Sequence, residues 1–203
     1  MLLFLDIISP IPEFCVIDDN KVILQEKIIK NETDRLSDNI IQSYIKIDKR
    51  LNLTQNLKKI STTIGPGSYT SLRVGSAFIS GLMISRKISY HPLSIEDILN
   101  FNSKISSKKN LGVFITSSNN QQFLCYKNKD NVMEYKKIEN NKCSIPKHIE
   151  LILFNKTEIN ENNKLEQIQF SFFEDFYKNY NNLTFKKNII IKPIYISNNQ
   201  LLS

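Results

Sequence analysis

Glycine is scarce in this sequence, and most of the glycines stand close together. Average usage near 7% would give roughly fourteen glycines in a chain of this length, yet only five occur among the 203 residues. Four of the five lie between Gly65 and Gly81. Because glycine permits backbone conformations and close approaches that other residues resist, we expect this stretch to organise the fold.

Histidine and cysteine are also rare, which limits the chemistry that the chain can perform. His91 and His148 are the only histidines, and neither has the i, i+4 partner of a His-x-x-x-His metal site. No Gly-x-Ser-x-Gly elbow or Cys–His motif indicates a nucleophile. The cysteines, Cys15, Cys125 and Cys143, share no metal-like or redox-like spacing, which favours reduced thiols. We therefore predict no catalytic residue and no metal site.

Long hydrophobic runs are missing as well. The opening segment, residues 1–6, is too short and too soon charged for a signal peptide or a membrane span. We expect a cytoplasmic protein without membrane contact.

Arginine is a minor part of the positive charge. The net charge of +7 and the pI near 9.2 are compatible with nucleic-acid binding. However, only four of the 27 basic residues are arginines, which read phosphates and bases better than lysines do. The lysines are scattered among asparagines and isoleucines, which is typical of an AT-rich coding bias. This pattern does not favour a nucleic-acid surface on this chain alone.

The glycine-rich stretch is predicted to form a strand, a loop and a helix. A β-branched run at 59–64 precedes the Gly-Pro-Gly turn, and a helix-length segment of small and apolar residues follows. Ser68 or Thr70 can cap that helix and leave first-turn N–H groups facing an anion. The candidate loop residues are Gly65, Pro66, Gly67, Ser68, Tyr69, Thr70 and Arg73.

Three interpretations of the loop stay open. An anion near Arg73 would offset the unfavourable position of this cation at the positive end of the helix dipole. Either a phosphate, including that of a nucleotide, or a carboxylate from a partner protein would serve. Alternatively, the loop is only a tight connection, and Arg73 extends into solvent. A Walker loop is excluded because no Gly-Lys-Ser/Thr follows the first glycine.

The same residues carry a resemblance to a known family. The run Gly-Pro-Gly-Ser-Tyr-Thr-Ser-Leu-Arg-Val-Gly at 65–75 resembles the signature of the TsaB (YeaZ-like) family, the non-catalytic subunits of the bacterial tRNA threonylcarbamoyladenosine (t6A) complex, formerly classed as glycoproteases. The similarity covers residues 3 to about 127 and returns at 192–197, where Lys-Pro-Ile-Tyr-Ile-Ser is similar to the family's closing motif.

The resemblance implies an α/β, actin-like (ASKHA) fold with two βββαβαβα-type lobes, the second one reduced. We place the first lobe at 1–100 and the second at 101–203. The pattern agrees over the first lobe, with a meander of strands at 2–8, 13–17 and 21–29, a helix at 34–51, the strand and helix of the glycine-rich stretch and a strand at 88–93. Ser94-Ile-Glu-Asp is predicted to begin the next helix with a capping box. Asn31 or Thr33 is the expected cap of the first helix.

Two helices are implied as the partner interface, at 34–51 and 69–86. The first has an amphipathic stripe that includes Leu36, Ile40 and Tyr44 and is widened by Ile41 and Ile45. In the second, Ser71 and Gly75 share one small face, and Ala77 and Gly81 share another. The predicted interface residues are Leu36, Ile40, Tyr44, Gly75, Ala77, Ser80 and Gly81. The alternative is that these faces pack on the chain's own sheet.

The sequence departs from the family pattern in two turns. Asp6 and Ser9 form a polar turn, but the family's threonine is replaced by Ile7, and Asp6 is equally explained as a cap of a loop amide. In the second lobe, Thr116, Ser118 and Gln121 stand where relatives have three charged residues. The consequence of this loss is left open.

The second half is less clearly patterned. Runs at 111–116 and 123–127 are predicted to form a hairpin, and 160–164 a surface loop. Phe173, Phe176, Tyr177 and Tyr180 form a helical stripe that we assign to the core. Residues 189–196 are predicted to be a closing strand.

The expected function is that of an accessory, non-enzymatic subunit. The resemblance implies a heterodimer with a TsaD-type catalytic subunit, contact with a TsaE-type ATPase, and access to tRNA mainly through the complex. It implies no cofactor bound by this chain alone and leaves open an ATP or ADP site at the joint interface and a homodimer in the partner's absence. The alternative is a small-molecule kinase or ATPase that uses the Gly-Pro-Gly loop for phosphate. A missing nucleophile–base pair argues against a peptidase.

Overall fold

A first sheet organises the amino-terminal half of the chain. The computed structural model describes residues 1–31, 34–108, 110–139, 144–156 and 165–196. Its first sheet contains β1 (Leu2–Asp6), β2 (Glu13–Asp18), β3 (Lys21–Lys27), β4 (Lys59–Thr63) and β5 (Ser89–Leu93), in the order β3-β2-β1-β4-β5. The first three strands form an antiparallel meander, while β4 and β5 run parallel to β1. The predicted strands of this lobe are confirmed.

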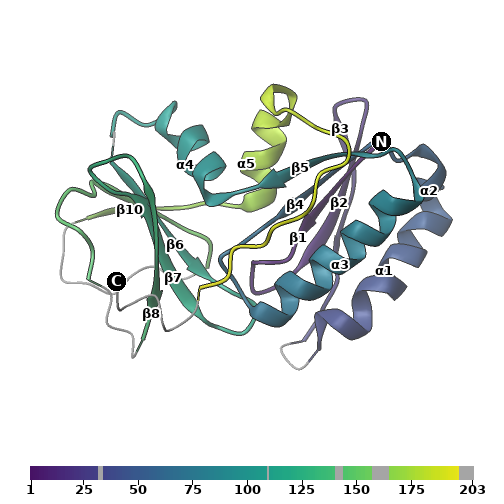
Figure 1. Cartoon of the computed structure of the whole chain (residues 1–203), viewed down its shortest axis with the longest axis horizontal. Coiled ribbons are helices and arrows are strands. Elements are labelled where there is room, and N and C mark those ends of the chain that lie inside the picture. The colour runs from purple at the N-terminus through teal and green to yellow at the C-terminus, as the bar shows by residue number, and fades with distance from the viewer. Residues whose placement is uncertain (32–33, 109, 140–143, 157–164, 197–203) are drawn as a thin grey trace.

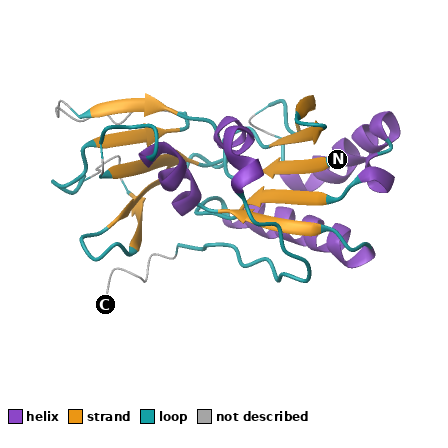
Figure 2. Ribbon diagram, turned by 90° about the horizontal axis from the view of Figure 1, so that it is seen from above, coloured by secondary structure: helices purple, strands orange, loops and turns teal. Residues whose placement is uncertain are grey.

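A second sheet repeats this topology beside the first (Figures 1 and 2). It contains β6 (Leu111–Thr116), β7 (Gln122–Lys127), β8 (Met133–Ile138), β9 (Leu151–Phe154) and β10 (Glu166–Gln169), in the order β10-β9-β6-β7-β8. Again a three-strand meander is followed by two parallel strands. The described residues between β8 and β9 and between β9 and β10 contain no helix. The prediction of two α/β lobes of actin-like type, the second one reduced, is confirmed.

Helices cover both faces of the first sheet. On one face lie α1 (Leu36–Leu51), α2 (Leu53–Asn56) and α3 (Tyr69–Ser85) (Figure 1). The ring of Phe14 on β2 contacts Tyr44 of α1 and Phe78 of α3. On the other face, Phe176 of α5 (Phe172–Asn179) stacks on Phe4 of β1, with ring centroids 4.6 Å apart. Apolar side chains from both sides therefore bury β1 completely.

The aromatic stripe of the last helix is mostly core, as predicted. Phe173, Phe176 and Tyr180 are buried, and Tyr177 is partly buried. Tyr180 belongs to a short 3-10 helix, Tyr180–Asn182, that follows α5. Because α5 packs on β1, a segment after residue 101 completes the core of the first lobe. The division at residue 100 stays a prediction.

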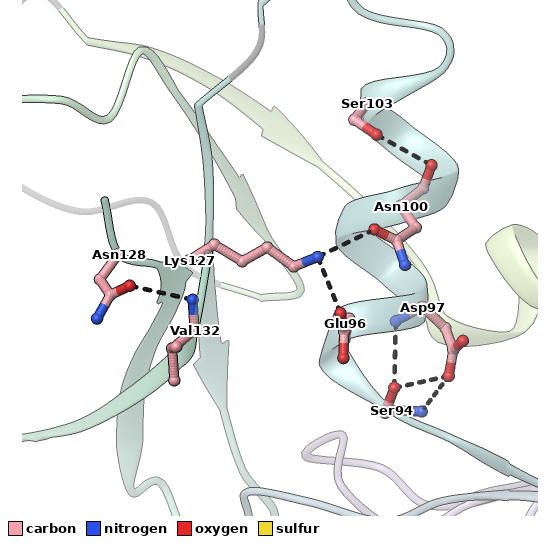
Figure 3. Close-up of polar contacts among 8 residues, drawn as sticks. All are labelled: Ser94, Glu96, Asp97, Asn100, Ser103, Lys127, Asn128 and Val132. Atoms are coloured by element: carbon pink, nitrogen blue, oxygen red, sulfur yellow. Dashed lines mark hydrogen bonds and ion pairs between the residues drawn. The ribbon is translucent and has the colours of Figure 1, made fainter. Parts of the chain in front are cut away.

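Helix α4 (Ile95–Ser103) joins the two lobes. It begins with the predicted capping box, in which the Ser94 hydroxyl accepts from the Asp97 N–H and the Asp97 carboxylate accepts from the Ser94 N–H. Figure 3 shows Lys127, the last residue of β7, reaching this helix. Its ammonium lies 2.8 Å from the Glu96 carboxylate and also contacts the Asn100 side chain. These contacts tie the second sheet to the helix that leaves the first.

One predicted helix cap and one predicted strand are wrong. Asn31 does not cap α1, which begins after Arg35 without a side-chain cap; Thr33 lies outside the described residues. The Asp34 carboxylate instead accepts from the N–H groups of Lys30 and Asn31, and because of this turn the helix begins later than predicted.

Residues 189–196 are extended but form no strand. Within them, the Ile194 N–H donates to the Ile64 carbonyl oxygen at 2.7 Å. The loop predicted at 160–164 lies outside the described residues.

Candidate functional site

The Gly-Pro-Gly loop is enclosed by other parts of the chain. Gly65 has φ +113°, and a Cβ atom there would lie 2.5 Å from the Ile194 carbonyl oxygen. Gly67 lies on the other side of the loop, where a Cβ atom would be 3.4 Å from the Ile8 side chain. The loop is therefore packed between the turn after β1 and the C-terminal segment, which we define as residues 183–196. Close approach of the chain to itself explains Gly65.

An aromatic pair covers the start of α3. The rings of Tyr69 and Tyr195 lie 5.0 Å apart, and the Arg73 guanidinium lies 5.3 Å from the Tyr69 ring centroid. The ring face partly offsets the unfavourable position of Arg73 in the first turn. Ser68 is the N-cap of α3, as predicted, and accepts from the Ser71 N–H; Thr70 is exposed and is not the cap. Pro66 is buried in the loop.

Asp6 holds the turn that follows β1. One carboxylate oxygen accepts from the N–H groups of Ile8 and Ser9 and from the Thr63 hydroxyl. Burial raises the pKa of this carboxyl, and the hydrogen bonds from Ser9, Ile8 and Thr63 oppose the rise. The side chain is 3% exposed. Asp6 is thus placed as a structural cap that fixes the turn against β4, one of the two roles considered for it.

The turn after β6 lies where the two lobes meet. The Ser118 N–H donates to the Ile8 carbonyl oxygen at 3.1 Å, and the Ser118 hydroxyl lies 2.9 Å from that of Ser71 on α3. Hydrogen bonds between uncharged groups therefore connect the lobes at Ser118, a position where relatives are expected to have a charged residue. Thr116 is buried, and its backbone is held by the Asn155 amide, which accepts from the Thr116 N–H and donates to the Thr116 carbonyl. The Gln121 carbonyl closes the turn by accepting from the Ser117 N–H.

A cleft of about 590 Å³ opens beside this contact. Its lining is made of amides, hydroxyls, two lysines and a few apolar side chains: Ser9, Pro10, Ile11, Ile29, Lys30, Asn31, Ser118, Asn119, Asn120, Asn155 and Lys156. No carboxylate is among these described residues. A kinase or ATPase site would need a carboxylate to hold its magnesium ion, and this cleft offers none among the described residues. A second cavity, beside Ser68 and Thr70, is lined by Asp34, whose carboxylate already accepts from the Lys30 and Asn31 N–H groups. Neither cavity adds support for that alternative.

Both histidines have structural partners. The Nδ1 atom of His91 lies 3.1 Å from the Thr184 carbonyl oxygen, and Nε2 of His148 lies 3.2 Å from the Lys127 carbonyl oxygen. In the part of the chain that the structure describes, no three potential ligands from His, Cys, Asp and Glu come together. Cys15 and Cys125 are buried, burial raises the pKa of both thiols, and Cys143 lies outside the described residues.

The face predicted to bind a partner is divided between buried and exposed residues. Leu36, Ile40 and Tyr44 face the chain's own core and are 6%, 2% and 7% exposed, so their prediction as interface residues is corrected. Gly75 is also internal, because a Cβ atom would lie 2.7 Å from Ile7. The Ser71 and Gly75 face of α3 therefore packs inward.

The other faces of the same helices point outward. Ile41 and Ile45 of α1 are 57% and 39% exposed, and Ile84 of α3 is 87% exposed. Ala77 and Gly81 are exposed on α3, and Ser80 is partly exposed. A Cβ atom at Gly81 would meet nothing within 4 Å. Figure 1 shows α1 and α3 side by side, so these residues belong to one outward face, which we call the α1–α3 face.

Comparison with known proteins identifies the family. The family model described as TsaD, tRNA N6-adenosine threonylcarbamoyltransferase, matches residues 24–190. The chain belongs to the TsaD family. A search of curated proteins finds no match.

Solved structures place this TsaD-family chain in the YeaZ fold. YeaZ from Pseudomonas aeruginosa superposes with a TM-score of 0.59 at 11% identity, over 96% of this chain and 99% of that one. A second crystal structure, titled an uncharacterized protein with similarity to peptidase YeaZ from Pseudomonas aeruginosa, gives a TM-score of 0.55 at 12% identity, over 97% of this chain and 99% of the other. The resemblance to the TsaB (YeaZ-like) family is thus supported by family and by fold, and together they support a t6A-related role.

Some contacts of this TsaD-family chain were not predicted from its sequence. Ser118 joins the two lobes through its hydrogen bond to Ser71, and Asn155 holds the end of β6 beside the end of β9 within the second lobe. An asparagine after a strand carries no pattern that could have revealed its partner.

No helix in the described residues is long and apolar enough to span a membrane.

Proposed function

We propose that this chain is an accessory, non-catalytic subunit that supports a TsaD-type catalytic partner in t6A modification of tRNA, and that the partner docks on the α1–α3 face. The match to the TsaD family supports a role in this reaction, and the similarity of fold over nearly the full length of YeaZ supports the accessory role. A TsaE-type ATPase completes the proposed complex, and a nucleotide, if one is used, binds where the subunits meet.

The observation that carries the docking site is Gly81. Glycine within a helix costs about 1 kcal/mol relative to alanine, and at Gly81 no atom of the described residues lies within 4 Å of the position that a Cβ would take. One turn further along the same face, Ile84 is 87% exposed. A partner helix that approaches closely at Gly81 and covers Ile84 explains both features.

The proposed non-catalytic role is supported by the polar groups that are already engaged. Asp6 is bonded to Ile8, Ser9 and Thr63, and each histidine contacts a backbone carbonyl. The side chains that could best act as a catalytic acid or base therefore already form hydrogen bonds that hold the fold. The chemistry is accordingly assigned to the partner.

The test is association of the purified chain with the TsaD-type protein of the same genome. Ala77→Arg places a long charged side chain on the α1–α3 face and is expected to weaken association at least tenfold, with little change in melting temperature because Ala77 is exposed. Ser103→Arg, at an exposed position at the end of α4 and outside the α1–α3 face, is the matched control. Binding of Ala77→Arg with wild-type affinity would place the partner elsewhere, and unfolding would show that the face is internal.

A further inference from the structure

The positive charge of the chain is unevenly distributed. No acidic residue occurs between Asp48 and Glu96, and none follows Asp175. These two stretches carry 11 of the 27 basic residues and none of the 20 acidic ones, so the rest of the chain has 16 basic residues against 20 acidic ones. The net charge of +7 therefore arises from two segments that are far apart in the sequence.

The fold brings these segments together at one end of the first sheet. The stretches contain four adjacent basic pairs. Lys49-Arg50 ends α1, where Arg50 pairs with Glu26 at 3.6 Å. The other three pairs meet at this end: Lys58-Lys59, Arg86-Lys87 and Lys186-Lys187. The Ser89 N–H donates to the Lys58 carbonyl at 3.0 Å, which places the second pair beside the first. Lys186 pairs with Tyr90 on β5 through hydrogen bonds of 2.8 and 3.0 Å, which adds the third.

The six residues lie together at the amino ends of β4 and β5 and on the C-terminal segment beside them. Strands lie about 4.8 Å apart, so the three pairs span about 10 Å. Figure 1 shows this end near the N-terminus, on the side of the first lobe away from the second sheet. We call it the basic end and define it as Lys58, Lys59, Arg86, Lys87, Lys186 and Lys187. This arrangement differs from the scattered distribution that the sequence indicated.

The basic end is exposed, and the described part of the chain gives it no ion-pair partner. All six residues are exposed. Among the described residues, none of the six forms an ion pair. Lys59 lies over the Phe185 ring, 5.0 Å from its centroid. Asp18, at the same end but on β2, pairs with the N-terminal ammonium at 3.4 Å. Unpaired cations held close together repel one another, and an anionic partner would remove that repulsion.

We propose that the basic end binds the phosphate backbone of the tRNA on which the complex acts. This inference rests on the proposed function, which supplies RNA as the polyanion. Five of the six residues are lysines, which bind phosphate as point charges and do not match base edges bidentately. The contact therefore positions the tRNA and adds affinity without reading its sequence. The partner's active site is left to recognise the adenosine.

The test uses one substitution from each basic pair. In Lys58→Gln/Lys87→Gln/Lys187→Gln, three exposed charges are removed, and Lys59, which packs on Phe185, is kept. Lys104→Gln/Lys129→Gln/Lys147→Gln removes three exposed lysines elsewhere and is the matched control. Binding of an unmodified tRNA transcript with adenosine after its anticodon is measured by fluorescence anisotropy at several salt concentrations, for the chain alone and with its partner.

We expect the slope of log affinity against log salt to become shallower by about three in the test variant, roughly one per lost phosphate contact. The control variant is expected to keep the wild-type slope, and a tRNA without that adenosine to bind equally well. An unchanged slope in the test variant, or loss of binding to phosphatidylserine vesicles but not to tRNA, would overturn the proposal. Partner association is measured on the same samples. If it persists while the slope is unchanged, only the basic end is wrong; if the wild-type chain does not bind the partner, the proposed function fails.

Discussion

Gly75 lies against the side chain of Ile7, so closely that a Cβ atom would be 2.7 Å from both its Cδ1 and Cγ2 atoms. Gly81, six residues later on the same helix, has no such neighbour. The two glycines of α3 therefore have different structural roles. Gly75 lets the helix approach the turn after β1, whereas Gly81 leaves space on the outer face of the molecule.

The first prediction contrasts these glycines. Gly75→Ala is expected to destabilise the isolated chain by about 1–3 kcal/mol through overpacking against Ile7. Gly81→Ala is expected to stabilise it by about 0.5–1 kcal/mol through helix propensity, which raises the melting temperature by about 2 °C. Thermal denaturation of both variants measures the difference. Equal destabilisation would mean that Gly81 also faces internal atoms.

The second prediction concerns the Gly-Pro-Gly loop and the C-terminal segment. Gly65→Ala is expected to cost about 1–3 kcal/mol, because alanine disfavours φ near +113° and its Cβ would meet the Ile194 carbonyl. Gly67→Ala is the control, since its Cβ would make only an ordinary contact with Ile8. Urea denaturation gives the stabilities, and limited proteolysis after residue 183 should accelerate in Gly65→Ala alone. Equal stability of the two variants would show that the C-terminal segment does not restrict the backbone at Gly65.

The third prediction concerns Asp6 and pH. Asp6→Ala removes the acceptor for Ile8, Ser9 and Thr63, at about 1–3 kcal/mol for each buried donor left unsatisfied. Asp6→Asn keeps an acceptor oxygen and is expected to lose far less.

The raised pKa of Asp6 fixes the sign of the pH effect. The folded state favours the protonated carboxyl, so the stabilisation from proton uptake is present below the unfolded pKa and is lost as pH rises through the folded pKa. Asparagine does not titrate. The stability of Asp6→Asn relative to wild type should therefore increase from acid to neutral pH, as measured by urea midpoints. A decrease over this range would show that the folded protein prefers the ionised form.

The fourth prediction concerns catalysis by the isolated chain. The cleft lining has no carboxylate among the described residues to hold a magnesium ion, and the sequence has no nucleophile–base motif. We therefore expect negligible ATP turnover and no peptidase activity. Steady-state ATP hydrolysis by the purified protein, measured with a coupled assay, tests this. Turnover that Lys30→Ala or Lys156→Ala abolishes would favour the kinase or ATPase alternative.

Local patterns predicted the first lobe well. The run of apolar residues in β1, the Ser94 capping box and the Ser68 cap depend on neighbours in the sequence, and the structure has all three. The end of the chain was harder. Ile189, Ile190 and Ile191 have strand propensity, but past the pairing of Lys186 with Tyr90 the structure contains no strand there.

The candidate site shows the same limit. Periodicity identified both helices of the α1–α3 face but not which side of each stripe points outward, because that depends on the sheet beneath. Tyr44 is buried by Phe14 and Phe78, whereas Ile45 beside it is exposed. The basic end was missed because the three lysine and arginine pairs are adjacent only after β4, β5 and the C-terminal segment meet.

The most direct measurement is t6A in cellular tRNA, quantified by nucleoside mass spectrometry after depletion of this protein. The account predicts that t6A falls while other modifications stay constant, that wild-type protein restores it, and that Ala77→Arg does not, although it accumulates normally. Unchanged t6A after verified depletion would contradict the account.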